Sequence, residues 1–480
     1  MRQPVVLASF VCAAALTAAA QSPPPAPAPA PAGFDRAAAQ RDTYALLKEL
    51  VALNTQNPPG NEIVVARRLD AMFNGVPGVE THVIDPGDGR ANFIARLRAT
   101  SPSKRAVLIM GHMDVVGADT SKWQSPPFAA TERDGYLYGR GVIDDKGALA
   151  ASAIAMRTLA SMRDRLDRDV ILLGTAAEEG AGGQGIERMV AEHFDLIKDA
   201  EFALNEGGRV RMRNGRVAAV AIQVTEKLSY TVRATARGTS GHGSVPLPDN
   251  AIAALGRALA RVHEAQAPVR VNAISRQYFA QLAKIEQDPA LKEAMLTVST
   301  ATDQTTIDKA AAVLSRDPTY SATLRTGASI TMINGGVRAN VIPSDATATL
   351  NVRTLPDGDI TRDVAEMNRI AGEPHVTFAL QGTPKKAPPV SPTTTALYRA
   401  MEAAATTMAP DAVVMPFLST GATDGAELRA HGIPTYGILP MPLDNEDELR
   451  MHGDNERVPL GSLGWATEYL YRVLVAVTAR

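Results

Sequence analysis

Three apolar, β-branched runs of the sequence each end in charged side chains. His112 and Asp114 come directly after the first run. Glu178 and Glu179 follow the second run, and Glu206 follows the third. Side chains alternate along a strand, so His112 and Asp114 point to the same side, where the carboxylate can orient a metal-binding imidazole. The pattern favours a metal site, although a hydrogen-bonded core histidine and an exposed acidic loop also explain the single motifs.

Two adjacent carboxylates, Asp144 and Asp145, occupy a glycine-flanked turn before an apolar helix. Such a turn can hold one carboxylate rigidly enough to bridge two metal ions. An N-capping aspartate with a solvated neighbour is the alternative explanation. His452, late in the chain, offers a second imidazole. Taken together, the carboxylates and the two histidines supply the ligands that a two-zinc site needs.

The composition excludes several other classes of protein. Among 480 residues, 49 Lys and Arg nearly balance 51 Asp and Glu, so no basic field exists to attract nucleic acid, which is not an expected partner. The only cysteine is Cys12. Because Cys12 lies in an N-terminal segment that we expect to be removed, disulfides and thiolate ligands are excluded from the mature protein.

The first 33 residues are predicted to lie outside the folded protein. Residues 1–20 have the basic start, the apolar run and the small-residue end of a signal peptide. The apolar run is too short for a membrane span, so we expect none in the mature form. Residues 21–33, which are mostly Pro and Ala, are predicted to form an extended linker. We therefore expect an exported protein that is periplasmic or secreted.

The rest of the chain alternates apolar runs with amphipathic helical stretches. This pattern indicates an α/β fold with a mixed, mostly parallel sheet and helices on both faces. In residues 226–382 the strands alternate apolar and polar positions, which predicts an inserted, smaller α+β lid or dimerisation domain. Extra helices are expected within this insert, from about 268 to 325. The catalytic domain accordingly comprises residues 34–225 and 383–480.

The motifs follow one another in a recognisable order. They are Gly-His-Met-Asp, Gly-Arg-Gly-x-x-Asp-Asp-Lys-Gly, Glu-Glu-Gly, Asn-Glu-Gly-Gly, Gly-His-Gly-Ser and a late His-Gly. From about Asn54 onward this order resembles the zinc exopeptidase family of carboxypeptidases, aminoacylases and succinyl-diaminopimelate desuccinylase, and it looks closest to the carboxypeptidase S-like branch. The resemblance implies a zinc exopeptidase-like fold and a metallopeptidase or aminoacylase-type hydrolase. Its substrate would be a small peptide or an N-acyl amino acid.

The resemblance also implies a ligand set for two Zn²⁺ ions, with Co²⁺ or Mn²⁺ as substitutes. Asp144 would bridge the two ions, and the peptide bond that follows it would be cis. His112 and Glu206 would complete one site. Glu179 and His452 would complete the other.

Five further residues take roles by the same resemblance. Glu178 is expected to be the general base, and Asp114 to orient a ligand histidine. His242 matches a lid histidine that donates to the developing oxyanion and often arrives from a partner subunit, so a homodimer is allowed. Asn340 and Arg353 match positions that contact substrate, and Arg353 suits a bidentate grip on a carboxylate.

Two other functions compete with this interpretation. Gly180–Gly185 satisfies the pattern G-x-G-x-x-G of an NAD-dependent oxidoreductase, but the carboxylates of Glu178 and Glu179 would repel a pyrophosphate. A catalytically dead binding protein of the same fold is the second alternative, and the presence of every expected ligand argues against it. Judged without the family, His242 is a turn residue and Arg353 is a surface charge.

Overall fold

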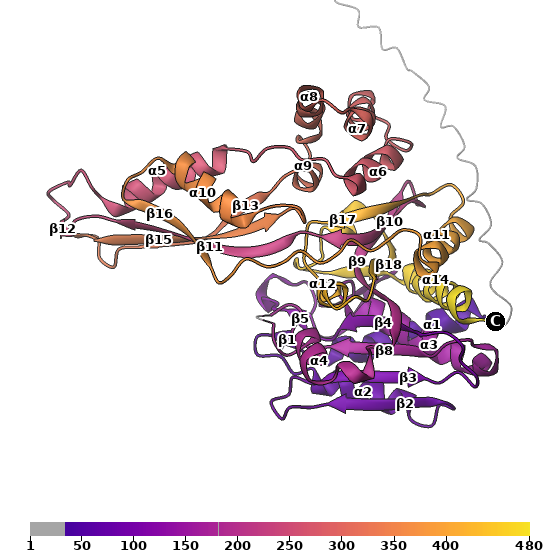
Figure 1. Cartoon of the computed structure of the whole chain (residues 1–480). Coiled ribbons are helices and arrows are strands. Elements are labelled where there is room, and N and C mark those ends of the chain that lie inside the picture. Colours follow the sequence, from indigo (N-terminus) through magenta and orange to yellow (C-terminus); the bar gives the residue numbers. More distant parts are fainter. Residues whose placement is uncertain (1–33, 181) are drawn as a thin grey trace, which may run out of the picture.

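The computed structural model describes residues 34–180 and 182–480. The predicted signal peptide and linker, residues 1–33, lie outside the described residues. Figure 1 shows a compact α/β body and a long arm that extends from it. Within the described residues, no helix has both the length and the apolar character needed to cross a bilayer.

An eight-stranded sheet forms the centre of the body (Figure 1). From edge to edge its strands are β17 (Val413–Ser419), β10 (Arg216–Glu226), β18 (Thr435–Leu443), β9 (Ala200–Arg213), β4 (Ala106–His112), β8 (Val170–Thr175), β3 (Asn92–Leu97) and β2 (Val79–Ile84). Strand β4 runs parallel to both of its neighbours, β8 and β9, whereas β2 and β3 are antiparallel at one edge. The sheet is therefore mixed, and its parallel centre brings several strand ends together.

Helices cover both faces of this sheet. The helices on one face are α1 (Arg36–Ala52), α2 (Ile63–Phe73), α3 (Lys146–Leu159), α11 (Ala396–Met408) and α14 (Leu460–Thr478). Those on the other face are α4 (Ile186–Glu192) and α12 (Gly425–Ala430). On β4, Val107 and Ile109 belong to the first core, and Leu108 and Met110 belong to the second. Two buried faces explain why the strand is apolar throughout, and the predicted fold class is confirmed.

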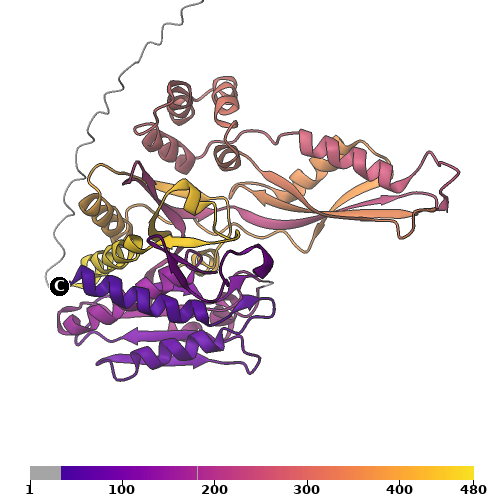
Figure 2. The same ribbon diagram turned by 180° about the vertical axis from the view of Figure 1, so that it is seen from behind.

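Four more helices pack against the far end of the sheet. They are α6 (Ala273–Leu282), α7 (Pro289–Thr300), α8 (Gln304–Leu314) and α9 (Pro318–Leu324). Their core includes Phe279 and Leu314, and it meets Ala221 of β10 together with Met415 and Phe417 of β17. The sequence predicts these helices as part of the inserted domain, but Figure 2 shows them over the body and not along the arm.

A four-stranded antiparallel sheet makes the arm. Its strands, in order, are β13 (Gly327–Gly335), β15 (Asp345–Thr354), β11 (Leu228–Arg237) and β16 (Val376–Gln381). One face packs against α5 (Ala251–Glu264) and α10 (Ile360–Ala371). Side chains of β11 alternate between buried and more exposed positions, as the sequence pattern predicts. At the far tip, β12 (Gly241–His242) pairs with β14 (Val341–Ile342).

Short elements complete the fold. The remaining strands and helices are β1 (Gln56–Asn57), β5 (Val115–Val116), β6 (Thr131–Arg133), β7 (Tyr136–Tyr138), β19 (Arg457–Pro459), α13 (Asn445–Glu448) and the 3₁₀ helices Thr120–Lys122, Ala160–Arg165 and Phe194–Leu196. Strand β1 pairs with β5, just after β4, and β19 pairs with β7. These two pairings bring segments from both ends of the chain to the carboxyl end of β4.

Candidate metal centre

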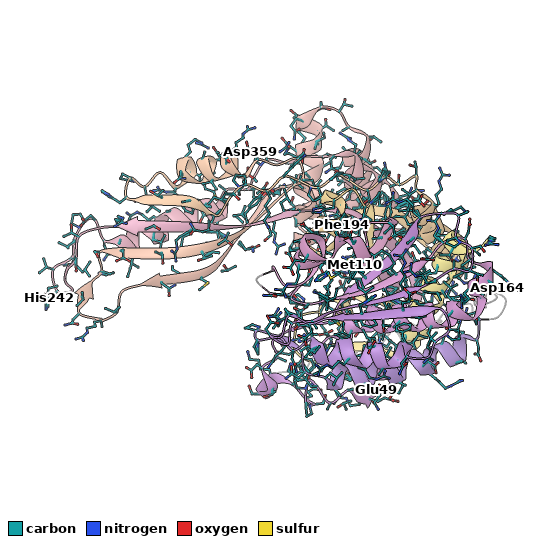
Figure 3. All side chains as sticks on the ribbon, turned by 60° about the horizontal axis from the view of Figure 1, so that its bottom comes forward. Glu49, Met110, Asp164, Phe194, His242 and Asp359 are labelled. Carbon is teal, nitrogen blue, oxygen red and sulfur yellow. The ribbon has the colours of Figure 1, made fainter. Side chains whose placement is uncertain are left out.

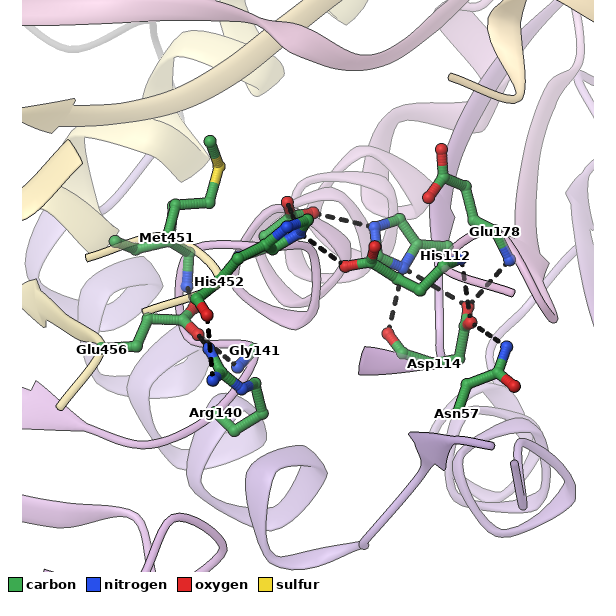
Figure 4. Close-up of polar contacts among 12 residues, drawn as sticks. Asn57, His112, Asp114, Arg140, Gly141, Glu178, Met451, His452 and Glu456 are labelled. Atoms are coloured by element: carbon green, nitrogen blue, oxygen red, sulfur yellow. Dashed lines mark hydrogen bonds and ion pairs between the residues drawn. The ribbon is translucent and has the colours of Figure 1, made fainter. Parts of the chain in front are cut away.

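The ends of β4 and β8 bring predicted ligands close together. Strand β4 ends at His112, and the segment after β8 carries Glu178 and Glu179. Ala177, just before them, has a φ of 58°, a left-handed conformation that turns the chain sharply and is rare for a residue with a side chain. Figure 4 shows Glu178 and His112 side by side, with Asp114 beneath them.

Asp144 lies between the two histidines. Its Oδ1 is 2.8 Å from Nε2 of His112, and its Oδ2 is 3.0 Å from Nε2 of His452. Nε2 of His452 also lies 2.8 Å from Oε1 of Glu179. The peptide bond between Asp144 and Asp145 is cis, as the resemblance implies. Each oxygen of one carboxylate therefore faces a different imidazole, which is the arrangement expected of a ligand that bridges two ions.

The ligand atoms form two overlapping triads, in each of which they lie within 4.8 Å of one another. The two triads are His112, Glu178 and Glu179, and Asp144, Glu179 and His452. Glu179 belongs to both. Its Oε1 is buried and lies 2.8 Å from Nε2 of His452, so the two side chains can share an ion.

Glu206 lines the same cavity from β9, although it is in neither triad. The sequence predicts that a strand ends here, whereas β9 continues to Arg213. What changes is the pairing: β9 pairs with β4 up to Leu204 and with β10 from Arg209. Gly207, which lies between these segments, has a φ of 120°. Glu206 thus occupies the point at which the strand leaves β4, and a functional side chain can sit there without interrupting the strand.

The centre concentrates negative charge. Burial raises the pKa of Glu206 well above its ordinary value, and the charge of Asp144 adds to the effect. Burial likewise raises the pKa of Glu178. In the described part of the chain, Asp144 and Glu179 form ion pairs only with histidines, and no lysine or arginine pairs with Glu178 or Glu206. Buried carboxylates need cations, so this donor set fits divalent metal ions.

Asp114 holds several of these groups in place. Nδ1 of His112 donates to the backbone oxygen of Asp114 at 3.0 Å, which leaves Nε2 free to face the carboxylate of Asp144. The Asp114 carboxylate, 3.5 Å from that Nδ1, accepts hydrogen bonds from the backbone N of Glu178 and of Glu179, both at 3.1 Å. It also accepts one from Nδ2 of Asn57 at 2.9 Å. One buried aspartate therefore fixes both strand ends relative to each other.

Glu456, which was not among the predicted site residues, fixes the turn of the bridging aspartate. It is fully buried. Its Oε2 accepts from Nη1 of Arg140 at 2.7 Å and from the backbone N of Gly141 at 3.1 Å (Figure 4). Its Oε1 accepts from the backbone N of Ile143 at 2.8 Å. Its place in the sequence, shortly after His452, was the only local signal that could have pointed to it.

A cavity of about 1040 Å³ is lined by four of the five predicted metal ligands, Asp144, Glu179, Glu206 and His452. Arg353, on β15 at the base of the arm, lines its wall. The loop after β17 lines another wall with Thr423 and Asp424, and burial raises the pKa of Asp424 to about 7. The volume is at the upper end of the range for small-molecule sites, about 300 to 1,000 Å³.

His242 and Asn340 lie elsewhere. Both are at the tip of the arm, where the backbone N of Gly243 donates to the backbone oxygen of Asn340 at 2.8 Å. Figure 3 labels His242 at the end of the arm, far from the body. Neither residue lines the cavity. The fold thus brings Arg353 to the predicted metal ligands but leaves these two residues apart from them.

Comparisons with known proteins identify relatives of the chain. The model of peptidase family M20/M25/M40 matches residues 108–476. The probable carboxypeptidase S-like 2 of Dictyostelium discoideum is 29% identical over 382 residues, which are 78% of this chain and 72% of that relative. The N-fatty-acyl-amino acid synthase/hydrolase of Homo sapiens is 26% identical over 394 residues, which are 79% of this chain and 75% of that relative.

A solved structure shares the fold. The M20 family metallo-carboxypeptidase from Sulfolobus solfataricus superposes with a TM-score of 0.68 at 20% identity, covering 90% of this chain and 98% of its own. The family match spans all five predicted metal ligands, and the relatives are hydrolases, so the oxidoreductase alternative is set aside. The chain is a hydrolase that acts on amide bonds and belongs to peptidase family M20/M25/M40.

Proposed function

We propose that the chain is a two-metal exopeptidase of the carboxypeptidase type, or an N-acyl-amino-acid hydrolase, that releases an amino acid with a free carboxylate. The observation that carries this proposal is the Asp144 carboxylate, which lies between Nε2 of His112 and Nε2 of His452. A carboxylate in that position suits a pair of divalent ions held side by side. Family membership supports the amide-bond chemistry.

Each ion would take its ligands from one side of Asp144. His112 and Glu206 are assigned to one ion, and Glu179 and His452 to the other. Zn²⁺ fits because the donors are imidazole and carboxylate groups, and Co²⁺ or Mn²⁺ could substitute. Bound there, the ions would supply Lewis acidity to the scissile carbonyl and to a water molecule.

Glu178 is the proposed general base. Oδ1 of Asp114 accepts a hydrogen bond from its backbone N at 3.1 Å, so the side chain is held beside His112 (Figure 4). From there it would take a proton from the attacking water and return it to the leaving amine. Asp114 would act through the groups that it positions, without touching the substrate.

The cavity accommodates both candidate substrate classes. A volume of about 1040 Å³ has room for a small peptide or for an extended acyl chain. One relative is named a probable carboxypeptidase and another an N-fatty-acyl-amino acid synthase/hydrolase, so both classes are proposed for this chain. Arg353 lines the cavity and would bind the free carboxylate that the two classes share.

A homodimer would complete the site. We assign His242 and Asn340 to the cavity of a partner chain, because both lie at the tip of the arm and neither lines its own cavity. Strand β13 is an edge strand of the arm's sheet and exposes Ile330, Met332 and Ile333. Such an exposed apolar edge is a surface at which two sheets pair. His242 would then donate to the oxyanion that develops on the scissile carbonyl.

Export is proposed on the basis of residues 1–20. Cleavage of this signal peptide after Ala20 would leave Gln21 as the first residue. N-terminal sequencing of the protein recovered from the periplasm or the medium is expected to begin at Gln21. An intact Met1 on protein retained inside the cell would contradict export.

A substrate screen tests the proposed activity. Zinc-loaded protein is assayed against dipeptides and against N-acyl amino acids with short and long acyl chains, matched in the amino acid that is released. We expect release of that amino acid, loss of activity after exhaustive chelation and recovery with Zn²⁺. Activity that survives chelation, or a metal-loaded protein that hydrolyses nothing in the panel, would contradict the proposal.

A further inference from the structure

Lys227 stands where the body joins the arm. It lies between Glu226, the last residue of β10, and Leu228, the first residue of β11. Its backbone N donates to the backbone oxygen of Ser419 at 2.9 Å, which fixes it against the end of β17. Lys227 lines the cavity, although it is only 1% exposed. A buried lysine therefore contributes to the cavity wall.

This ammonium has no counter-charge among the described residues. Nζ of Lys227 donates to the backbone oxygen of Arg325 at 2.7 Å, and no carboxylate lies within ion-pair distance of it. An ammonium has three donors, so one carbonyl leaves two of them unused. Burial, together with the neighbouring charge of Arg353, lowers the pKa of Lys227 to about 8. A bound anion would relieve both effects.

Arg353 places a second cation beside the first. The strand register sets Arg353 opposite Ser229 of β11 on one side and Gly327 of β13 on the other, next to the segment that carries Lys227. Nε of Arg353 donates to Oδ1 of Asn351 at 2.9 Å. Its Nη1 is buried and has no hydrogen-bond partner within the described part of the chain. Two cations with unused donors thus face one cavity.

The neighbouring carboxylate of Glu226 is occupied by other donors. It accepts from the backbone N and Oγ1 of Thr423, both at 2.9 Å, and from Nε2 of Gln223 at 2.7 Å. Nη2 of Arg429 lies 3.0 Å from it and neutralises its charge. Glu226 therefore holds the loop after β17 and forms no ion pair with Lys227. An anion that binds the two cations has to come from a ligand.

We propose that Lys227 and Arg353 form one anion clamp for the free carboxylate next to the scissile amide, and that Lys227 makes this carboxylate a requirement. The inference rests on the proposed function, which places the scissile amide at the metal centre. Arg353 lines the same cavity as Glu178 and Glu179, so a carboxylate held by the clamp would lie in the cavity of the metal centre. A substrate with a neutral carboxamide would leave two buried cations without a partner, which disfavours its binding.

Variants at Lys227 test the clamp on a matched pair of substrates, an N-acyl amino acid and its carboxamide. Lys227→Met removes the charge at similar length, and Lys227→Gln keeps a donor for the Arg325 carbonyl. We expect KM for the carboxylate substrate to rise roughly tenfold or more in both variants, because a charged hydrogen bond is lost, with kcat and metal content nearly unchanged. The carboxamide is expected to react at least as well as before, because the variants remove one of the two unpaired cations. Lys309→Met, at an exposed position of α8, is the matched control for loss of a lysine charge.

Binding to an inactive protein separates the clamp from catalysis. Zinc-loaded Glu178→Gln is titrated by calorimetry with N-acetyl-L-leucine and with N-acetyl-L-leucinamide. Adding Lys227→Met should weaken binding of the first roughly tenfold and should not weaken binding of the second. If the unaltered protein hydrolyses the panel but neither KM nor binding depends on Lys227, the clamp is wrong and the proposed function stands. If it hydrolyses nothing yet carboxylate binding depends on Lys227, the proposed function is wrong and the clamp stands.

Discussion

The metal centre and the tip of the arm hold their functional residues in opposite ways. At the metal centre, His112 and His452 come from distant parts of the chain, and each lies within 3.0 Å of Asp144. At the tip, His242 and Asn340 are close to each other but far from the cavity that they are proposed to serve. One chain thus brings its predicted ligands together alone, whereas the oxyanion donor that we propose, His242, would have to come from a partner chain.

Asp144→Asn is expected to have the largest effect, and it tests whether Asp144 bridges two metal ions. A neutral amide cannot balance two divalent ions, so we expect fewer than two bound ions per chain and a loss of at least about 10³-fold in kcat/KM. Metal analysis of the purified protein and steady-state kinetics measure the two effects. An unchanged melting temperature of the metal-free protein is the control for folding. Full metal content in the variant would remove Asp144 from its bridging position.

Glu178→Gln tests whether Glu178 transfers protons without being needed for metal binding. The variant should keep both metal ions and lose about 10² to 10⁴-fold in kcat, the range of a general base. Metal content is measured on the same sample as turnover. Turnover near that of the unaltered protein would reject the role of Glu178 as base, and loss of metal would make it a ligand instead.

His242→Ala tests whether the tip of the arm contributes to catalysis. Removal of an oxyanion donor should lower kcat by about 10² to 10³-fold. Co-expression of His242→Ala chains with Glu178→Gln chains should then restore about a quarter of full activity, because half of randomly paired dimers are mixed and each has one complete site. Native mass spectrometry verifies the mixed dimer. Mixed dimers without any recovery of activity would show that His242 does not act across the interface.

Glu456→Gln is expected to have the smallest effect of the four. The variant keeps the metal ligands but weakens the hydrogen bonds between residue 456 and the turn that carries Asp144. Metal affinity should therefore fall about 10 to 100-fold. The buried guanidinium of Arg140 also loses its charged partner, and we expect the free energy of unfolding to decrease by about 3 kcal/mol. Glu446→Gln, at an exposed carboxylate of α13, is the control. Equal metal affinity in the two variants would contradict a positioning role for Glu456.

Residues whose roles follow from local patterns could be predicted from the sequence. His112 directly follows an apolar strand, and Asp144 stands in a glycine-flanked turn, so their positions depend on a few neighbours. Glu456 depends on hydrogen bonds to a segment more than three hundred residues earlier, since 316 positions separate it from Arg140. Asn57 likewise reaches Asp114 across 57 positions. Contacts at such separations have no periodicity that a sequence pattern could reveal.

In the arm, too, the strands could be predicted from the sequence, but their position in space could not. Alternating residues in β11 predict a half-buried strand, and the strand is found. The position of His242 depends instead on how far the arm projects, which no local pattern encodes. Helices α6 to α9 are likewise predicted as helices, but their packing against Met415 and Phe417 of β17 comes from contacts that their own sequence does not specify.

That packing limits how the protein could be shortened. Helices α6 to α9 fall between β11 and β13 along the chain, so a deletion that trims away the whole insertion would take them with it. The truncated body would then present Ala221, Met415 and Phe417 to solvent as a bare apolar surface, the kind of surface that drives aggregation. A minimal version of the body must therefore keep these helices and splice the chain within the arm, beyond the segment that they occupy.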